Sequence, residues 1–305
     1  MKWSEYQDAF IAYLKAEKAY SVHTLKAYSS DLSQCATFLE TRSCEIIQDV
    51  GSRDLRAWIL DLQEQVGNRS ISRKISAVKR FYTFLERRYG LEENPTLKLV
   101  IPKFQKKLPE PIPKQDLKNL LQEEWLDDFP SRRDQLIIEL LYATGMRKSE
   151  LIGLRDGDVD KSRKLIKVTG KRNKQRLIPL NDYMLQMIDE YKYLRDREFP
   201  SEKAQVLLLT NVGEKMYPKF VYRVVKDYLG RVTQRVKRSP HMLRHSFATD
   251  LLDEGADLVA IKELLGHANL SATQVYTNTS LSHLKEVYNK AHPRSRDDEK
   301  NNESL

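Results

Sequence analysis

The sequence predicts a mainly α-helical protein of two domains, with one small β-hairpin or sheet in the second domain. Three observations support this fold class. Apolar residues recur at helical spacing from residue 4 to about residue 89. The proline-rich stretch IPKFQKKLPEPIP, at 101–113, is incompatible with a regular helix or a central strand. Helical patterns then resume around one strand–turn–strand pattern, and a chain of 305 residues suits about two domains.

The first domain is predicted as four amphipathic helices. The second helix starts after Ser21, a good N-cap, and the third begins near Ser52. The fourth runs from about Ser70 until Gly90 stops it. The prolines that follow make a stiff, extended connection, so we expect a linker between the two domains there.

The fourth helix carries an unbalanced charge. Seven basic residues stand against one acid, Glu86, between Arg69 and Tyr89. A solvated helix face usually mixes signs, so this excess predicts a face that meets the phosphate backbone of DNA. The chain agrees in sign, with a net charge of +9. The predicted DNA-binding residues are Arg69, Arg73, Lys74, Lys79 and Arg80.

The second domain begins with a helical pattern from Lys114 to about Leu154. A β-hairpin follows, with strands at 164–168 and 176–180 joined by the basic turn TGKRNKQ. The remaining helices are predicted at 181–198, 217–236, 241–253, 257–265 and 280–290. The polar ending RSRDDEKNNESL is expected to be disordered.

Composition excludes several classes of protein. No run of about 18 apolar residues is present, so we expect no membrane span. The beginning MKWSEYQDAF lacks the layout of a signal peptide, which favours the cytoplasm. Cys35 and Cys44 match no zinc pattern and make no disulfide framework, so we expect both to be reduced and buried or half-buried.

The histidines could form a metal site, because five of the six lie between residues 241 and 292. His241 and His245 are four apart, as in the zinc motif H-E-x-x-H. Met242 stands where that motif needs glutamate, however, and Arg244 would place a positive charge beside the cation. We therefore expect no metal and no cofactor, and a structural or core role for His245.

Two arginines suit a phosphodiester target, because a guanidinium can donate two hydrogen bonds to non-bridging oxygens and keeps its charge. Arg244 shares a helix face with His241, three residues earlier. Arg147 follows Gly145, which permits a tight turn before a new helix. Each arginine alone would more often serve in a salt bridge.

The motifs gain meaning when they are taken together. Their order along the chain is TGMRKSEL, TGKRNKQRLIPL, HMLRHSFAT, LLGH and TQVYT. With these segments the sequence resembles the tyrosine recombinase (phage integrase) family, and within it the Xer-type (XerC/XerD-like) recombinases, over nearly the whole chain. The resemblance implies a two-domain clamp around DNA. A SAM-like helical core-binding domain would cover 1–104, a linker 105–111, a catalytic domain 112–293 and a tail 294–305.

The resemblance also implies a catalytic set: Arg147, Lys171, His241, Arg244, His267 and Tyr276. Tyr276 would be the nucleophile, giving a 3′-phosphotyrosyl link and a free 5′-hydroxyl. Lys171 would protonate the leaving 5′-oxygen. The two arginines would clamp the non-bridging oxygens, and of the two histidines one would assist proton transfer and the other would bond the phosphate.

Elementary chemistry agrees with this set. A phenol has a pKa near 10, and a pocket of positive charge lowers it. The covalent link retains a phosphodiester, so no ATP is needed and no P-loop motif is present. Lys174 competes with Lys171 for the hairpin tip. Arg172 stands where Xer proteins often have glycine, and Asp250 where many family members have histidine.

The expected function is recombination between two short sites in double-stranded DNA, by a tetramer through a Holliday junction. The expected cellular task is resolving chromosome dimers at cell division, with a second Xer-type recombinase as partner and a septal DNA translocase as activator. A helix at 281–290 would dock on a neighbouring subunit or on its own domain. The alternatives are an integrase of a mobile element, a type IB topoisomerase and a non-catalytic DNA-binding protein.

Overall fold

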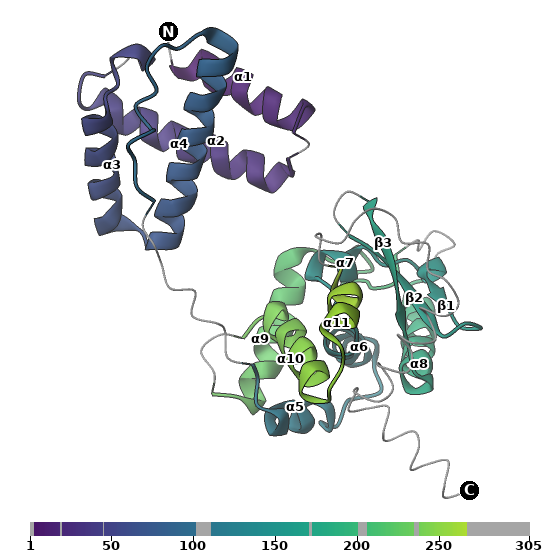
Figure 1. Cartoon of the computed structure of the whole chain (residues 1–305). Helices are drawn as coiled ribbons and strands as arrows, with labels where there is room; N and C mark the ends of the chain where they lie inside the picture. Colours follow the sequence, from purple (N-terminus) through teal and green to yellow (C-terminus); the bar gives the residue numbers. More distant parts are fainter. Residues whose placement is uncertain are drawn as a thin grey trace, which may run out of the picture. The chain divides into compact units, whose positions relative to one another are not determined.

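The computed structural model divides the chain into two compact units, residues 1–107 and 108–305, each with its own hydrophobic core (Figure 1). We describe each unit by itself. The structure describes residues 3–18, 20–44, 46–101, 111–170, 173–200, 206–234 and 238–266.

The first unit is built from four helices and one short 3₁₀ helix. They are α1 (Trp3–Ala16), α2 (Val22–Glu40), η1 (Ile47–Asp49), α3 (Ser52–Gln65) and α4 (Asn68–Tyr89). Helix α4 contacts the other three α-helices, and its apolar face is fully buried. Ser21 accepts a hydrogen bond from the N–H of Thr24, and Gly90 ends α4 at a φ of 65°. The predicted four helices and both end signals are confirmed.

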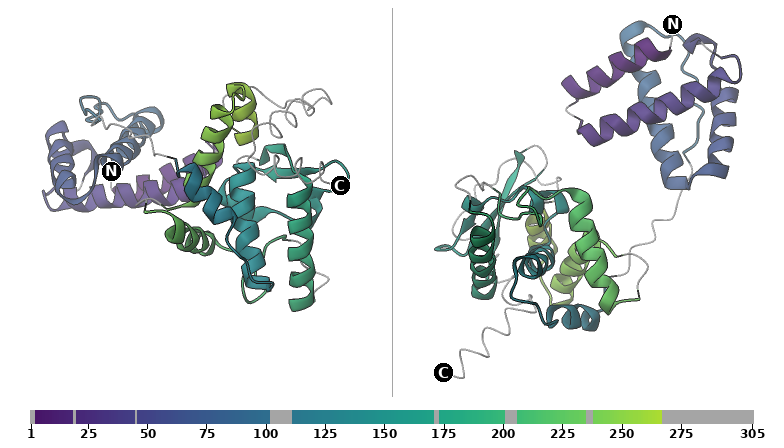
Figure 2. Two further views of the ribbon diagram at one scale, coloured as in Figure 1. Left: turned by 90° about the horizontal axis from the view of Figure 1, so that it is seen from below. Right: turned by 180° about the vertical axis from the view of Figure 1, so that it is seen from behind.

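The second unit combines helices with a small antiparallel sheet at one side (Figure 1). It comprises α5 (Lys114–Leu121), α6 (Phe129–Thr144), α7 (Lys148–Gly153), η2 (Asp156–Asp158), β1 (Val159–Asp160), β2 (Leu165–Thr169), β3 (Gln175–Pro179), α8 (Asp182–Glu198), α9 (Pro218–Val232), α10 (Pro240–Asp253) and α11 (Leu258–Leu265). Helix α6 is buried along most of its length and contacts α7, α8, α9 and α10 (Figure 2). It is the core against which the site elements pack.

The predicted hairpin is confirmed as β2 and β3, paired so that Val168 faces Arg176. The short strand β1, paired with β2, was not predicted, because two residues carry no readable alternation. The helical pattern predicted over 114–154 is divided into α5, α6 and α7. Helix α9 stops at Val232 rather than at residue 236, since Thr233 is already extended. The helix predicted at 280–290 and most of the linker lie outside the described residues.

Two compositional predictions can be compared with the structure. Cys35 is buried and Cys44 is half-buried, and both are free thiols, as predicted. In the ranges that the structure describes, no helix is both long enough and apolar enough to cross a membrane.

Candidate active site

Two of the predicted catalytic arginines meet at the C-terminal end of α11. Arg244, on α10, donates one hydrogen bond to the carbonyl of Gly145 and a second, of 2.7 Å, to that of Leu265. Arg147, at the start of α7, donates to the carbonyl of Gly266 over 3.1 Å. The last carbonyls of a helix carry partial negative charge and lack helical partners, so they are natural acceptors for guanidinium groups. Figure 1 shows α11 between α10 and the sheet.

A glycine makes this convergence possible. Gly145 ends α6 with a φ of 56°, and the chain then turns into α7 with Arg147 as its N-cap residue. A Cβ at position 145 would lie 2.3 Å from the ring of Phe247 and 2.9 Å from Leu265. The backbone can therefore approach α10 and α11 this closely only without a side chain. The predicted tight turn before a new helix is confirmed.

Glu150 is the anion of the site, and the sequence analysis missed it. Its carboxylate accepts from the backbone N–H of Arg147 over 2.7 Å, from Nη1 of Arg147 over 2.7 Å and from Nη2 of Arg176 over 2.9 Å. Burial acts to raise its pKa, but the bonds and charges of Arg176 and Arg147 outweigh burial and hold the pKa below its usual range. Glu150 is therefore ionised at neutral pH. Its sequence signal was an acid at the third position of a helix that starts after an arginine.

Arg176 was missed as well. Its side chain points inward from β3, with 6% of its surface exposed. Nε donates to the carbonyl of Leu264 over 2.6 Å, while Nη2 reaches Glu150. The hairpin thus contacts both α7 and the last turn of α11 through one side chain.

His241 lies at the start of α10, exposed and close to several positive charges. Partial burial and the charges of Lys148, Arg244 and Arg147 lower the pKa of its imidazole. It is therefore mostly neutral at neutral pH, able to donate one hydrogen bond and accept another. Burial, Arg147 and Arg176 lower the pKa of Arg244 to about 10, which leaves it cationic.

The other residues that the sequence singled out on α10 lie apart from these groups. His245 is half-buried rather than part of the core. Asp250 is buried, accepts a hydrogen bond of 2.8 Å from the hydroxyl of Tyr142, and lies 3.9 Å from Lys114. Over the described ranges, no group of three or more His, Cys, Asp and Glu side chains is placed to hold a metal ion.

Three predicted catalytic residues lie outside the described residues: Lys171, His267 and Tyr276. Gly170 and Gly266, which directly precede Lys171 and His267, are described by the structure. A Cβ on Gly170 would lie 3.1 Å from Oε1 of Glu150, and a Cβ on Gly266 would lie 3.2 Å from Nη1 of Arg176. Gly170 and Gly266 therefore both lie against the cluster of Arg147, Glu150 and Arg176.

The predicted DNA-binding residues belong to α4 in the first unit. Arg69, Arg73 and Arg80 are exposed and Lys79 is half-buried. Lys74 differs in its burial, because it is 5% exposed and its ammonium bonds the carboxylate of Asp31 at 3.1 Å and the side chain of Gln34. Arg73 also pairs with Asp31, but its side chain stays 43% exposed. A buried, paired ammonium offers no surface to a phosphate. The structure therefore does not support Lys74 as a DNA contact.

A second basic face lies on α9, where the sequence analysis did not look. Its exposed side chains, spaced as on one helix face, include Lys219, Tyr222, Arg223 and Lys226. The signal was the one used for α4, an excess of one charge sign, with Asp227 as the only acid of the helix.

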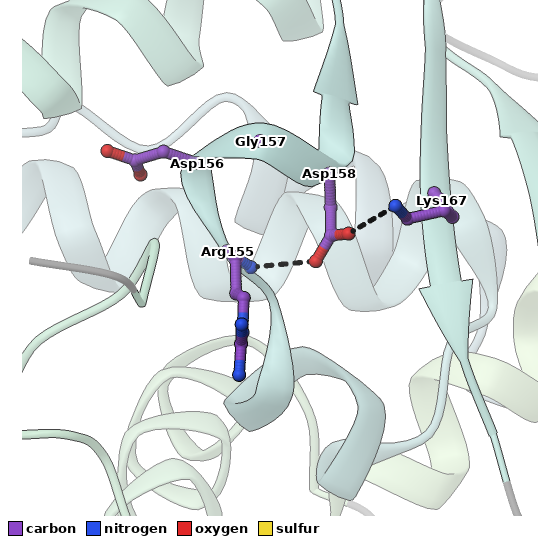
Figure 3. A pocket seen from close by; sticks show the side chains of 5 residues that line it. All are labelled: Arg155, Asp156, Gly157, Asp158 and Lys167. Atoms are coloured by element: carbon purple, nitrogen blue, oxygen red, sulfur yellow. Dashed lines mark hydrogen bonds and ion pairs between the residues drawn. The ribbon is translucent and has the colours of Figure 1, made fainter. Parts of the chain in front are cut away.

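A small pocket beside η2 carries none of the predicted catalytic residues. Its lining is Arg155, Asp156, Gly157, Asp158 and Lys167 (Figure 3). Asp158 accepts from the backbone N–H of Arg155 and pairs with Lys167 at 3.3 Å, so its charge is already balanced. We do not assign the reaction to this pocket.

Comparisons with known proteins cover both units. Residues 110–283 match the model of the phage integrase family, and residues 8–89 match that of the phage integrase N-terminal SAM-like domain. The tyrosine recombinase XerC of Anoxybacillus flavithermus is 39% identical over 292 residues, covering 94% of this chain and 97% of that protein. The tyrosine recombinase XerC of Chlorobaculum tepidum is 34% identical, with 94% of each covered.

Solved structures show the same fold at lower identity. The XerH site-specific recombinase bound to its difH substrate aligns with a TM-score of 0.66 at 21% identity, covering 87% of this chain and 79% of that one. A lambda integrase dimer bound to a COC′ core site aligns with a TM-score of 0.69 at 15% identity, covering 93% and 77%. The predicted fold class is confirmed.

Proposed function

The chain belongs to the phage integrase family and is a tyrosine recombinase, and we propose that it recombines double-stranded DNA at specific sites with Tyr276 as its nucleophile. The curated relatives that are named tyrosine recombinase XerC match this chain over nearly their whole length. The proposal adds the residues that perform each step.

In the proposed reaction Tyr276 gives its phenolic proton to one of the two pocket histidines, His241 or His267, and its oxygen attacks the scissile phosphorus. A bond forms between that oxygen and phosphorus, and the bond from phosphorus to the 5′-oxygen breaks. Lys171 gives its proton to the departing 5′-oxygen, which becomes a free hydroxyl. Attack by the 5′-hydroxyl of the exchanged strand reverses these steps and releases Tyr276. The phosphodiester is conserved, so no energy source is required.

The observation that carries the proposal is the convergence of Arg147 and Arg244 from separate elements on one helix end. Arg176 adds a third positive charge and Glu150 a single negative one. The cluster therefore keeps an excess of positive charge where Arg147 and Arg244 are proposed to bind the scissile phosphate. Fixed guanidinium groups there would stabilise the charge that grows on the phosphate oxygens during attack.

The histidines complete the proposed pocket. His241 is mostly neutral at neutral pH, because partial burial and the surrounding positive charges lower its pKa, so it can assist proton transfer from Tyr276 or bond a phosphate oxygen. His267 takes the other of these two roles.

Binding of the duplex is proposed to use both units. On α4 the candidates are Arg69, Arg73, Lys79 and Arg80, without Lys74. On α9 they are the exposed Lys219, Arg223 and Lys226. Cations on one helix face neutralise backbone phosphates irrespective of base sequence, so they would position the enzyme rather than choose its site.

The cellular task that we propose is resolution of chromosome dimers in the cytoplasm, because the curated relatives are XerC proteins. Four subunits would act on two paired sites through a Holliday junction, with a second Xer-type recombinase supplying two of them if the tetramer is mixed. A septal DNA translocase would activate the complex.

Covalent trapping tests the reaction. The full-length protein is incubated with a nicked suicide duplex that carries an Xer-type site, and the products are separated on a denaturing gel beside Tyr276→Phe. We expect a slow protein–DNA band in wild type alone. An equal band in both proteins would refute Tyr276 as the nucleophile.

Absence of a band in both proteins calls for a second round with host genomic fragments and candidate partner recombinases. A band that then forms in wild type alone supports the proposal. DNA binding without a band under every condition would favour a non-catalytic DNA-binding protein. Cleavage only at the ends of a mobile element would favour an integrase with the same chemistry.

A further inference from the structure

We propose that Arg176 is a positioning residue of the recombinase site, holding Arg147 and the end of α11 in one arrangement without itself contacting DNA. The inference rests on the proposed role of Arg147 as a phosphate clamp. It concerns a residue of β3 that lies within the segment TGKRNKQRLIPL but has no role in the catalytic set that the resemblance implies.

The two hydrogen bonds of Arg176 run to different elements. Nε donates to the carbonyl of Leu264 in the last turn of α11 over 2.6 Å. Nη2 donates to Oε2 of Glu150 on α7 over 2.9 Å. These acceptors lie 88 and 26 residues away along the chain, so one planar guanidinium fixes the mutual position of three elements.

The Glu150 carboxylate transmits this position to Arg147. Its oxygens bond Nη1 of Arg147, the backbone N–H of Arg147 and Nη2 of Arg176. Without Arg176, a carboxylate that is 2% exposed would keep Arg147 as its single cationic partner in the described cluster. We expect Glu150 to turn toward Arg147, which would shift its guanidinium and neutralise the charge meant for the phosphate.

The end of α11 ties Arg176 to the second clamp as well. Three successive carbonyls of its last turn accept from three different arginines: Leu264 from Arg176, Leu265 from Arg244 and Gly266 from Arg147. Gly266 also packs on Arg176, since a Cβ there would lie 3.2 Å from Nη1. A movement of this turn would therefore move the acceptors of both clamps together.

A matched control exists in the same unit. Arg195, on α8, is also buried, with 2% of its side chain exposed, and it likewise joins separate segments. It pairs with Asp156 at 2.8 Å and donates to the carbonyl of Leu207 over 2.9 Å. None of these partners belongs to the clamp, so a change at Arg195 reports the general cost of removing a buried arginine.

The test compares Arg176→Met, Arg176→Lys, Arg195→Lys and Arg147→Gln in the full-length protein. DNA affinity and the single-turnover rate of covalent complex formation at saturating protein are measured with the nicked suicide duplex, and thermal unfolding checks folding. For Arg176→Met we expect a cleavage rate lower by about 10²-fold, the order of effect of misplacing a catalytic group by 1 Å. Its DNA affinity should stay within about threefold, because the side chain of Arg176 is buried, with 6% of its surface exposed.

The conservative variants sharpen the comparison. Lysine at position 176 keeps the charge but cannot make both bonds, so we expect an intermediate rate. Arg195→Lys should unfold at lower temperature yet cleave bound DNA at the wild-type rate. An equal loss of rate in the Arg176 and Arg195 variants would refute the proposal, since the effect would then be one of general stability.

A duplex with a 5′-bridging phosphorothiolate gives the second readout. Its thiolate leaving group needs no proton, so it should restore cleavage in Lys171→Ala. Arg176→Met and Arg147→Gln should stay slow, because their defect lies in holding the phosphate. Restored cleavage in Arg176→Met would overturn the proposal and show that Arg176 supports the hairpin tip instead. These comparisons use a DNA site on which wild type forms the covalent complex. If wild type formed that complex on no duplex and with no candidate partner, the proposed function itself would fail.

Discussion

At the scale of single residues, the site is a problem of charge balance. Arg147, Arg176 and Arg244 are close enough to disfavour one another. Burial, followed by the charges of Arg147 and Arg176, lowers the pKa of Arg244 to about 10. Glu150 and three helix carbonyls offset part of this repulsion. The remainder can be offset by a bound phosphate, so the cluster is best stabilised when the proposed substrate is present.

His241 should set the acidic limit of cleavage. Its pKa is held below the usual 6.5, so the imidazole stays neutral at neutral pH and becomes protonated only as the pH falls below that value. If the neutral form is needed, the second-order rate of covalent trapping at low protein concentration should fall with a midpoint below pH 6.5. That rate reports the free enzyme, before a phosphate changes the local charge.

The control for this limb is His241→Gln, which cannot titrate at position 241. We expect this variant to react more slowly at every pH, and its second-order rate of covalent trapping should lack the fall at acidic pH that is due to His241. A limb with its midpoint above pH 6.5 in wild type, unchanged in His241→Gln, would contradict the assignment.

At the residue scale, the sequence singled out residues that belong to motifs of the family and overlooked residues whose role depends on long-range contacts. Arg147 and Arg244 were identified by motif, and the structure brings them to one helix end. Glu150 and Arg176 were missed, because their pairing depends on β3 packing against α7, and no local pattern encodes that contact. A buried arginine in a strand has no sequence signature of its own.

At the scale of elements, the ends of helices position the residues of the candidate active site. The sequence identified several of them, since Ser21 caps α2, Gly90 ends α4 and Gly145 permits the turn from α6 into α7, as predicted. Periodicity alone did not separate α5 from α6. It recovered the hairpin and missed β1, whose two residues depend on pairing with β2 rather than on any pattern of their own.

Lys74 shows why charge counting misled. It lies three residues after Ile71 and four before Val78, and therefore on the apolar stripe of α4. A lysine at that place needs a buried partner, which Asp31 of α2 provides. The position relative to the stripe, rather than the sign of the charge, separates Lys74 from the exposed Arg69, Arg73 and Arg80.

Gly145→Ala should disturb the second unit more than Gly255→Ala does. Both glycines have positive φ, 56° and 82°, so alanine at either costs about 1–2 kcal/mol of backbone strain. Only Gly145 meets neighbours, with Phe247 at 2.3 Å from the added Cβ, whereas nothing lies within 4 Å at Gly255. The clash should add about 1–3 kcal/mol.

Chemical denaturation measures the difference, followed by covalent trapping of whatever remains folded. Because the clash pushes Phe247 of α10 and Leu265 of α11 away from the turn before Arg147, Gly145→Ala should also cleave more slowly per folded molecule. Equal losses of unfolding free energy in the two variants would show that the close approach at Gly145 is readily relaxed.

At the scale of the whole molecule, two separately folded units each carry a basic helix face, on α4 and on α9. The net charge of +9 supports attraction to DNA but does not locate it. Exposure locates it better, because only cations with free surface can replace the counterions of a phosphate backbone. The sequence predicts the sign of this proposed interaction, and the exposure of the side chains narrows the candidate residues.

The salt dependence of DNA binding tests that selection. The logarithm of the association constant should fall linearly with the logarithm of salt concentration, with a slope near −0.9 for each phosphate neutralised. Arg69→Gln on α4 and Arg223→Gln on α9 should each reduce the magnitude of the slope by about 1, and the double variant by about 2. Lys74→Met is the matched change on α4, and it should leave the slope unaltered, since the ammonium of Lys74 is buried against Asp31.

A slope that changes with Lys74→Met but not with Arg69→Gln would mean that α4 presents a different face to DNA. A change with Arg223→Gln alone would assign backbone binding to the second unit and leave α4 without that role.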